Sequence, residues 1–352
     1  MAPDSNRPQI RRRNPATRLF SPAYAVAAVA LLVASCSAPT VPAPARSQSS
    51  PPPTGPSVTS PGRTKVVAVR SSMAPFTLPE AVSRPTIFAA SEGLLVIGGL
   101  TAADTTTQAI LRVDLHSGAV SPTGQLPVPV HDAAGAMVNG RYLIFGGGST
   151  AVTSAVQDVT PGSSPRVISH LPQPRADLVA VSDDAAGYVL GGFDGAQGST
   201  TILRTRDGRT FDVVGALPVS VRYPAVAAGG MSIWLFGGEH AGRQVTDVQR
   251  IDLRTGRGSV VGHLPSPLAH AGAFTLGGTI FVAGGRLGAR ATDRVMRFNP
   301  ANLSFTAAGH LPAARSDFGV VVVGGIAYLV GGESPRPVDT VIQVRAQAGG
   351  TS

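Results

Sequence analysis

The chain has almost no cysteine, since Cys36 is the one cysteine among its 352 residues. A framework of disulfides is therefore excluded, as is a catalytic thiol in the body of the chain. The sequence also contains no HExxH, no P-loop, no CxxC pair and no GxSxG. Because these motifs carry common metal, nucleotide, redox and acyl-transfer chemistry, we predict no catalytic residue, no metal site and no cofactor.

Lysine and aromatic residues are also scarce. Arginine makes up all but one of the 29 basic residues, and aromatic residues make up 5% of the chain. The formal net charge is +9, but residues 1–35 alone carry five arginines and one aspartate. No run of basic residues occurs in the rest of the chain, and few aromatic side chains are present to stack on bases. We therefore expect no nucleic-acid partner.

What the sequence does contain is a repeat. The pair Leu-Pro occurs six times, and a Gly-Gly pair begins 20 residues after each leucine. The leucines are Leu78, Leu126, Leu171, Leu217, Leu264 and Leu311, and the glycine pairs begin at Gly98, Gly146, Gly191, Gly237, Gly284 and Gly331. A period of 45–48 residues, filled with short apolar runs and no helical pattern, predicts a β-propeller with about four strands per blade. Six copies predict six blades.

Each repeat unit can be interpreted as four strands. An apolar run such as Leu94 to Ile97 precedes each Gly-Gly, and an earlier run joins it through a turn such as Asn139-Gly140. A polar loop, a third run such as Leu111 to Leu115 and a fourth, outer run follow. This order resembles the kelch repeat over residues 63–346, although most units lack the outer-strand Trp of that repeat. The resemblance implies an all-β, six-bladed kelch-type β-propeller, which is a scaffold and not by itself a function.

The ring needs a strand from the N-terminal side to close. Only 20 residues follow Gly332, which allows a third strand around Val338 to Val344 but not a fourth. We expect the missing strand before Leu78, with Lys65 to Val69 and Pro75 to Thr77 as candidates. Pairing the two ends removes the exposed edges of a linear array. Because a closed ring is a complete fold, we expect a monomer.

The N-terminal 62 residues differ from the repeats in composition. Residues 1–35 resemble a bacterial export signal, with basic residues before the apolar stretch Ala25 to Val33. Val33-Ala34-Ser35-Cys36 resembles a lipobox, which implies that Cys36 carries a lipid and anchors an extracytoplasmic protein to the bacterial cell membrane. A retained anchor and simple cleaved secretion are the alternatives, but the apolar stretch is shorter than the ~20 residues needed to span a bilayer.

The remaining segments outside the repeats are short. Residues 36–62 are rich in Ser, Pro and Thr and are predicted to form an extended tether. Residues 347–352 are predicted to be a disordered tail. Ordinary secretion is favoured over twin-arginine export because Asn14-Pro15-Ala16, which follow the arginines, fit that signal poorly.

Polar and charged residues follow each Leu-Pro at the start of the expected innermost strand, and a propeller brings these positions to one mouth of its channel. The ligand-binding candidates are Arg84, His131 beside Asp132, Arg175, Asp177, Arg222, Tyr223, His270, Arg315 and Asp317. Arginine can hold a carboxylate through its planar fork, aspartate can accept from sugar hydroxyls, and histidine beside aspartate can act as acid or base. The alternative is that the arginines orient loops and pair across blades.

Two functions from different classes follow. The first is a non-catalytic, lipid-anchored propeller that binds a protein or an envelope glycan through the channel mouth and the loops after Gly-Gly, which differ in sequence. The second is a sugar-processing enzyme that resembles the periplasmic kelch-type sialic acid mutarotase and uses the Arg and His residues of the same mouth.

Overall fold

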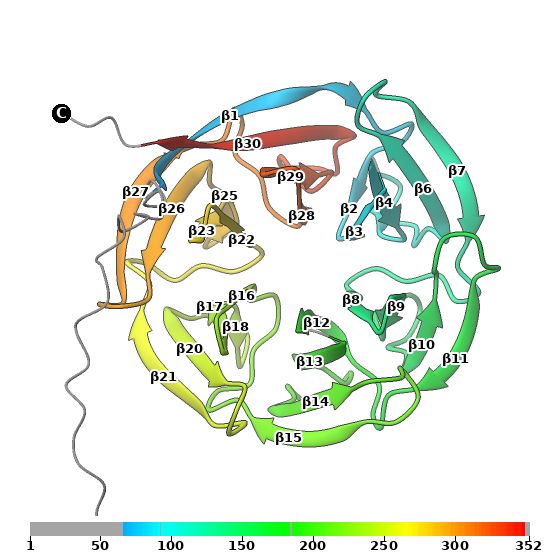
Figure 1. Cartoon of the computed structure of the whole chain (residues 1–352), viewed down its shortest axis with the longest axis horizontal. Helices are drawn as coiled ribbons and strands as arrows, with labels where there is room; N and C mark the ends of the chain where they lie inside the picture. Colours follow the sequence, from blue (N-terminus) through cyan, green and yellow to red (C-terminus); the bar gives the residue numbers. More distant parts are fainter. Residues whose placement is uncertain (1–65, 92, 184, 349–352) are drawn as a thin grey trace, which may run out of the picture. The chain divides into compact units, whose positions relative to one another are not determined.

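The computed structural model describes residues 66–348 except Glu92 and Asp184. These residues form a ring of six blades, each a four-stranded antiparallel sheet, and they contain no helix (Figure 1). The predicted all-β, six-bladed propeller with four-stranded blades is therefore confirmed. Within this part of the chain, no helix is long and apolar enough to cross a membrane. The predicted signal peptide, tether and lipidated Cys36, and residues 349–352 of the predicted tail, lie outside the described residues.

Each blade has its innermost strand at the channel and its outermost strand at the rim. In that order, the first two blades are β3 (Thr86–Ala90), β4 (Gly93–Ile97), β6 (Ala109–Asp114) and β7 (Val120–Gln125), then β8 (Ala134–Val138), β9 (Arg141–Phe145), β10 (Ala155–Asp158) and β11 (Arg166–His170). The next two are β12 (Ala176–Asp183), β13 (Ala186–Phe193), β14 (Thr201–Thr205) and β15 (Asp212–Ala216), then β16 (Ala225–Gly229), β17 (Ser232–Phe236), β20 (Asp247–Asp252) and β21 (Gly258–His263). The last two are β22 (Gly272–Leu276), β23 (Thr279–Ala283), β26 (Arg294–Asn299) and β27 (Ser304–His310), then β28 (Gly319–Val323), β29 (Ile326–Val330), β30 (Thr340–Ala348) and β1 (Val66–Thr77).

Three two-stranded ribbons complete the described strands. They are β2 (Val82–Ser83) with β5 (Leu100–Thr101), β18 (Glu239–His240) with β19 (Arg243–Gln244), and β24 (Arg286–Leu287) with β25 (Arg290–Ala291). Each involves residues that directly follow a Gly-Gly pair, so the ribbons belong to the loops that vary between the repeats.

The hydrophobic core lies between blades. Every residue of β4 and of β17 is buried, because neighbouring blades cover both faces of these second strands. In one core, Trp234 of the fourth blade packs edge-on against Phe298 of the fifth, with ring centroids 5.0 Å apart. Outer strands such as β7 are only partly covered. The continuous apolar runs of the sequence therefore mark second strands, and their burial joins adjacent blades.

Each Gly-Gly pair bonds to the next blade. The N–H of the second glycine donates to the carbonyl of the residue four positions after the next leucine, as in Gly99 to Val130 at 2.9 Å and Gly332 to Val82 at 2.8 Å. All six pairs make this bond, and both glycines of every pair have positive φ. A Cβ on Gly98 would lie 2.4 Å from the Val130 oxygen. Only glycine therefore fits this close approach between blades.

The N-terminal strand closes the ring, as predicted. β1 is antiparallel to β30 and forms the outer edge of the last blade, where the two ends of the propeller lie side by side (Figure 1). The predicted candidate segments fall in this one strand except for Lys65, which lies outside the described residues, and the strand has an irregular register between Met73 and Thr77.

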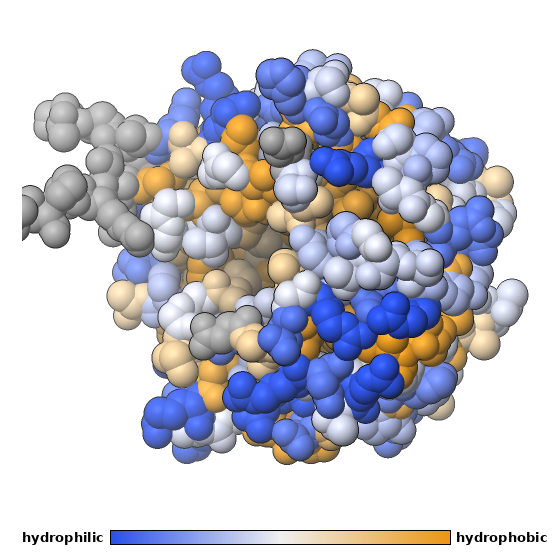
Figure 2. Space-filling view, turned by 45° about the vertical axis from the view of Figure 1, so that its right-hand side comes forward, coloured by the Kyte–Doolittle hydropathy of each residue, from blue (hydrophilic) through white to orange (hydrophobic). Residues whose placement is uncertain are grey.

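The surface carries few large hydrophobic side chains. Those exposed among the described residues are Met73, Met137, Val167, Val213, Met231 and Val260. Figure 2 shows hydrophilic residues over much of the visible face, with hydrophobic residues reaching the surface in strips between them.

Candidate functional site

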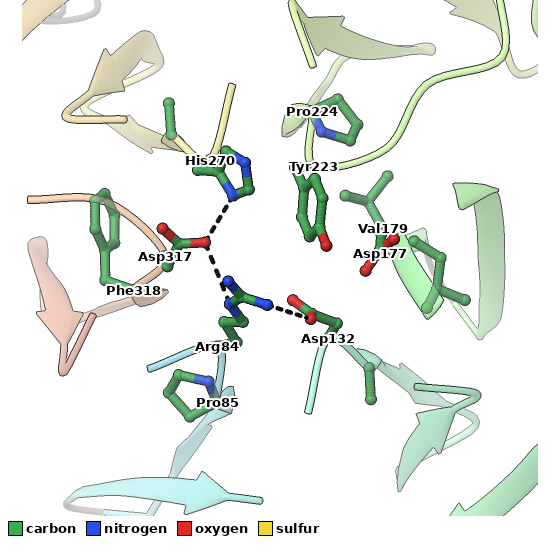
Figure 3. Close-up of a pocket in the computed structure, with 13 residues that line it drawn as sticks. Arg84, Pro85, Asp132, Asp177, Val179, Tyr223, Pro224, His270, Asp317 and Phe318 are labelled. Atoms are coloured by element: carbon green, nitrogen blue, oxygen red, sulfur yellow. Dashed lines mark hydrogen bonds and ion pairs between the residues drawn. The ribbon is translucent and has the colours of Figure 1, made fainter. Parts of the chain in front are cut away.

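The sixth residue after each Leu-Pro leucine points into the central channel. These six residues, one from each blade, are Arg84, Asp132, Asp177, Tyr223, His270 and Asp317. They line a cavity of about 130 Å³ together with the residues that follow them, such as Pro85 and Phe318 (Figure 3). These six side chains therefore lie together at one mouth of the channel, where the sequence predicts residues after Leu-Pro to lie.

All six ring residues have a left-handed backbone, with φ between 50° and 59°. Aspartate and histidine tolerate this conformation better than most residues, but arginine and tyrosine adopt it rarely. Glycine occupies most other positive-φ positions of the described chain, which makes its absence from the ring informative. Non-glycine residues held in this region cost about 1–3 kcal/mol each, and such strain clusters at functional sites.

A girdle of backbone hydrogen bonds holds the ring residues in place. The N–H of Asp177, Tyr223, His270, Asp317 and Arg84 each donates to the carbonyl of the preceding ring residue, over 2.6–3.2 Å. Between Arg84 and Asp132 the side chains make the link, since Arg84 Nη1 donates to Asp132 Oδ2 at 3.1 Å. The ring side chains are thus held on a rigid frame.

Arg84 lies among three carboxylates. Its guanidinium nitrogens are 3.1 Å from Asp132, 3.5 Å from Asp317 and 3.6 Å from Glu333. Burial lowers the pKa of Arg84, but the attraction of Asp132 and Asp317 outweighs it and the pKa rises. Arg84 is therefore permanently charged and already paired.

Asp132 and Asp317 respond to burial in opposite ways. Burial raises the pKa of Asp132 to about 7, with the charges of Asp177 and Asp317 adding to it and Arg84 opposing it. Burial also acts upward on Asp317, but the hydrogen bond and charge of His270, together with Ser316 and Arg84, lower its pKa to about 2. The cavity thus holds one firmly ionised carboxylate and one that titrates near neutral pH.

His270 and Tyr223 form a stacked pair on the opposite side of the cavity from Arg84 (Figure 3). Their ring centroids are 4.1 Å apart, and His270 Nδ1 lies 2.6 Å from Asp317 Oδ1. His270 Nε2 lies 3.3 Å from Glu239 Oε1, so each ring nitrogen faces a carboxylate. Burial and the nearby charges of Asp132 and Asp177 raise the pKa of Tyr223 above its usual value, so its hydroxyl keeps its proton.

Arg222 extends the site beyond the cavity. Its Nε donates to Asp177 Oδ2 at 2.5 Å, its Nη2 donates to the Tyr223 hydroxyl at 3.2 Å, and its guanidinium carbon lies 4.4 Å from the centroid of the Phe193 ring. Burial lowers the pKa of Arg222, but Asp177 outweighs it and the pKa rises. Arg222 also lines a groove of about 510 Å³ with Phe193, Glu239 and His240.

Residues directly after three of the Gly-Gly pairs belong to the same network, and none of them is in the set of ligand-binding candidates predicted from the sequence. Arg286 Nη2 lies 2.9 Å from Asp317 Oδ2 and also pairs with Glu333. The backbone of Glu239 forms an isolated β-bridge with that of Arg222. The backbone of Glu333 forms one with Ser316, the residue before a ring position. Their shared place after Gly-Gly was a usable signal, because the Gly-Gly loops lie on the same face as the ring.

Three predicted candidates lie elsewhere. Arg175 and Arg315 are only 1% exposed and do not line the cavity. They sit two residues before the ring position, and each donates within its own blade, Arg175 to Thr201 O at 3.0 Å and Arg315 to Gly331 O at 2.7 Å. Burial lowers the pKa of both. Their contacts are those of the alternative interpretation, in which arginines orient loops.

His131 also lies outside the cavity lining. Its Nδ1 is 2.8 Å from Thr106 Oγ1, and its Nε2 is 3.7 Å from Asp132 Oδ2. Burial and the charge of Arg84 lower its pKa. His131 therefore lies beside Asp132 but outside the cavity, whereas Asp132 itself faces the channel.

Negative charge predominates at the channel mouth. The carboxylates of Asp132, Asp177, Asp317 and Glu333 pair with the guanidinium groups of Arg84, Arg222 and Arg286, and the carboxylate of Glu239 faces His270. Nevertheless, no group of three or more His, Cys, Asp or Glu side chains in the described residues is arranged to hold a metal ion. The carboxylates are instead arranged around arginines and His270.

The comparisons with known proteins agree with this architecture. A family model described as "Kelch motif" matches residues 267–312, the region of the fifth blade, so the chain is a six-bladed propeller that carries a kelch repeat. A solved structure titled "Structure of YjhT" is similar at a TM-score of 0.66 and 18% identity, covering 77% of this chain and 98% of that one. At this identity the likeness shows the fold alone. A comparison with curated proteins finds no significant match.

Proposed function

We propose that this protein is an extracytoplasmic, lipid-anchored kelch propeller whose channel mouth binds an envelope glycan. The observation that carries the proposal is the ring of six functional side chains on left-handed backbone. The strain at these positions would be relieved by glycine. We infer that Arg84 and Tyr223 are kept there because their side chains serve a ligand as well as their contacts within the ring.

The charges favour a neutral, hydroxyl-rich ligand over an acidic one. Each arginine of the mouth already pairs with a carboxylate, Arg84 with Asp132, Arg222 with Asp177 and Arg286 with Asp317. A ligand carboxylate would have to displace one of these partners. Sugar hydroxyls, in contrast, can donate to the remaining carboxylate oxygens, and a sugar face can pack on the Tyr223 ring.

The proposal is tested by the melting temperature of the purified protein with neutral envelope oligosaccharides and, as an acidic comparison, sialic acid. Binding to the native state raises the melting temperature by mass action. We expect a neutral sugar to give the larger rise. Tyr223→Asn should abolish it, because asparagine tolerates positive φ but removes the ring from the cavity. The control is Arg243→Ala in the exposed β18–β19 ribbon, which should keep the rise.

Two results would count against a glycan site in the channel. One is a sugar-dependent rise of equal size in the wild type and in Tyr223→Asn. The other is no rise with any sugar, together with capture of a defined envelope protein that Arg243→Ala abolishes. The second result would favour a protein partner bound through the loops after Gly-Gly.

A sugar-processing enzyme is the second candidate, and the titration of Asp132 favours it. A carboxyl group with a pKa of about 7 can take a proton from, or return one to, a sugar hydroxyl near neutral pH. Anomer exchange needs such a group, because the anomeric hydroxyl loses a proton as the ring oxygen gains one. NMR exchange measurements on candidate sugars test this, and an exchange rate unchanged in Asp132→Asn would exclude Asp132 from that role.

The location is a separate part of the proposal and rests on the sequence around Cys36. Expression of the full chain in a bacterial host with a radiolabelled fatty acid should label the protein and place it in the membrane fraction. Cys36→Ala should remove the label and the membrane association. A Cys36→Ala protein that stays in the membrane fraction would favour a retained anchor.

A further inference from the structure

A second cavity lies between the first and second blades and shares no residue with the cavity at the channel mouth. Its volume is about 420 Å³, within the range of small-molecule sites. The apolar side chains of Leu95, Ile110 and Val159 line it and are each 4% exposed. Pro165 and Tyr142 belong to its second-blade side.

Comparison of equivalent positions in the six blades explains why this cavity exists. Leu95 of β4 pairs with Arg112 of β6. The pairs at the same place in blades three to six all begin with an aromatic residue: Tyr188 with Arg204, Trp234 with Arg250, Phe281 with Arg297, and Tyr328 with Gln343. Blade one therefore lacks an aromatic ring that four other blades have.

The second blade also has a leucine at this position, but its neighbour fills the space. Leu143 pairs with Asp158, and the turn at Gly208 of the third blade packs so closely that a Cβ there would lie 2.3 Å from Leu143 Cδ1. At Leu95 the corresponding space is open and lined by the β10–β11 connection, which contains Pro161 and Pro165.

The cavity has one cationic group. Arg112 is the one charged side chain among the described residues that line it, and no described carboxylate lies within ion-pair distance of its guanidinium. Its Nη2 donates to Ser91 O at 3.1 Å. The equivalent Arg204 instead pairs with Asp212 at 3.0 Å, and Arg250 lies 5.6 Å from the Trp234 ring. Among the described residues, which do not include Glu92, Arg112 therefore has neither a carboxylate nor its blade's aromatic ring as a partner.

We propose that this cavity binds a small organic anion with a flat apolar body. The body occupies the space that an aromatic side chain fills in blades three to six, and the acid group pairs with Arg112. A guanidinium group beside an apolar surface matches this chemistry, because it gives charge-assisted hydrogen bonds to the acid while the rest of the ligand is removed from water. This site is independent of the function proposed for the channel mouth.

The test compares two fluorescent probes on the full chain. The first is 8-anilinonaphthalene-1-sulfonate, and the second is N-phenyl-1-naphthylamine, which has the same rings and no charge. We expect each to bind one site on the wild type. Arg112→Gln introduces the residue that blade six has at this position, Gln343. It should lower the affinity for the sulfonate probe by about tenfold and leave the affinity for the neutral probe unchanged. Leu95→Phe should weaken the binding of both probes, because the new ring occupies part of the space that the rings of the probes need.

The matched control is Arg297→Gln, the same change at the equivalent position of blade five, which should leave both probes unaffected. A melting temperature of Leu95→Phe at or above that of the wild type shows that the variant is folded. The proposal is overturned if folded Leu95→Phe binds both probes as tightly as the wild type. It is also overturned if Arg112→Gln weakens both probes equally or neither, and this arm does not depend on the Leu95 variant.

Discussion

At the scale of single residues, the ring at the channel mouth shifts the pKa values of two of its carboxyl groups in opposite directions. Asp132 has a raised pKa of about 7 and Asp317 a lowered pKa of about 2. Burial by itself raises the pKa of both carboxyl groups. The difference arises because Asp317 accepts from His270 and Ser316, whereas Asp132 faces two other aspartates. Neighbours rather than residue type therefore decide which carboxylate can exchange a proton.

The contribution of Asp132 to the stability of the protein should fall as the pH rises from about 4 to 7, because native Asp132 holds a proton that the unfolded chain has lost. The loss is on the order of 1.4 kcal/mol for each pKa unit. Asp317 acts at the other end of the scale, since its lowered pKa contributes stability that is lost as the pH falls from about 4 to 2. Asp132→Asn should remove the first trend and keep the second.

Urea unfolding at pH 5 and pH 8 measures this prediction. On going from pH 5 to pH 8, the wild type should lose stability relative to Asp132→Asn, because only the wild type carries the proton on Asp132. Asp212→Asn serves as the control, because the Asp212 side chain is 69% exposed. An equal pH difference in the wild type and Asp132→Asn would show that Asp132 ionises normally.

At the scale of elements, two different devices hold the segments that follow Leu-Pro. Blades three and six use the buried Arg175 and Arg315. Blades two and four use the buried Gln157 and Gln249, whose side-chain amides bond both backbone groups of Val128 and Val219. Gln157 lies in β10 and is fully buried. The difference could not be inferred from the repeat, because these positions are apolar in the other blades.

Gln157→Leu should destabilise the protein by about 1–3 kcal/mol, because it leaves the N–H and C=O of Val128 without their partners. The equivalent residue of blade three is Leu203, so leucine itself fits the strand. Denaturant unfolding gives the free energy. Leu203→Met should cost less than about 1.5 kcal/mol as a volume-conserving control, and equal costs for the two variants would argue against the role of the Gln157 bonds.

At the scale of the whole molecule, the ring is closed twice. The outer closure is the pairing of β1 with β30, and the inner closure is the bond from Gly332 N–H to the carbonyl of Val82. Both join the last blade to the N-terminal end of the propeller. Loss of β1 would expose β30 as a long edge strand, which invites pairing with other chains.

A chain that begins at residue 63 should melt cooperatively at the temperature of the full chain. A chain that begins at residue 78 lacks β1 and should aggregate or lose its cooperative transition. Circular dichroism on heating and size-exclusion chromatography distinguish these results. A monomeric, cooperatively folded chain from residue 78 would show that the β1–β30 pairing is dispensable.

The sequence by itself determined the number of blades, the order of strands within them and the need for an N-terminal closing strand. Repeat spacing and continuous apolar runs are local patterns, and they report burial directly. It also predicted that residues after each Leu-Pro face the channel mouth. The sequence did not separate channel residues from buried ones, since Arg175 and Arg222 follow Leu-Pro at adjacent places.

Only the tertiary structure decided which charges meet. In the sequence, Leu-Pro and Gly-Gly are two motifs of one repeat. In the structure, each Gly-Gly bonds to the segment after the Leu-Pro of the next repeat. The pairing of Arg84 with Asp132 and Asp317, and the opposite titration of the two aspartates, depend on residues brought together from three blades. These contacts depend on how the blades close around the channel, which a pattern local to one repeat does not contain.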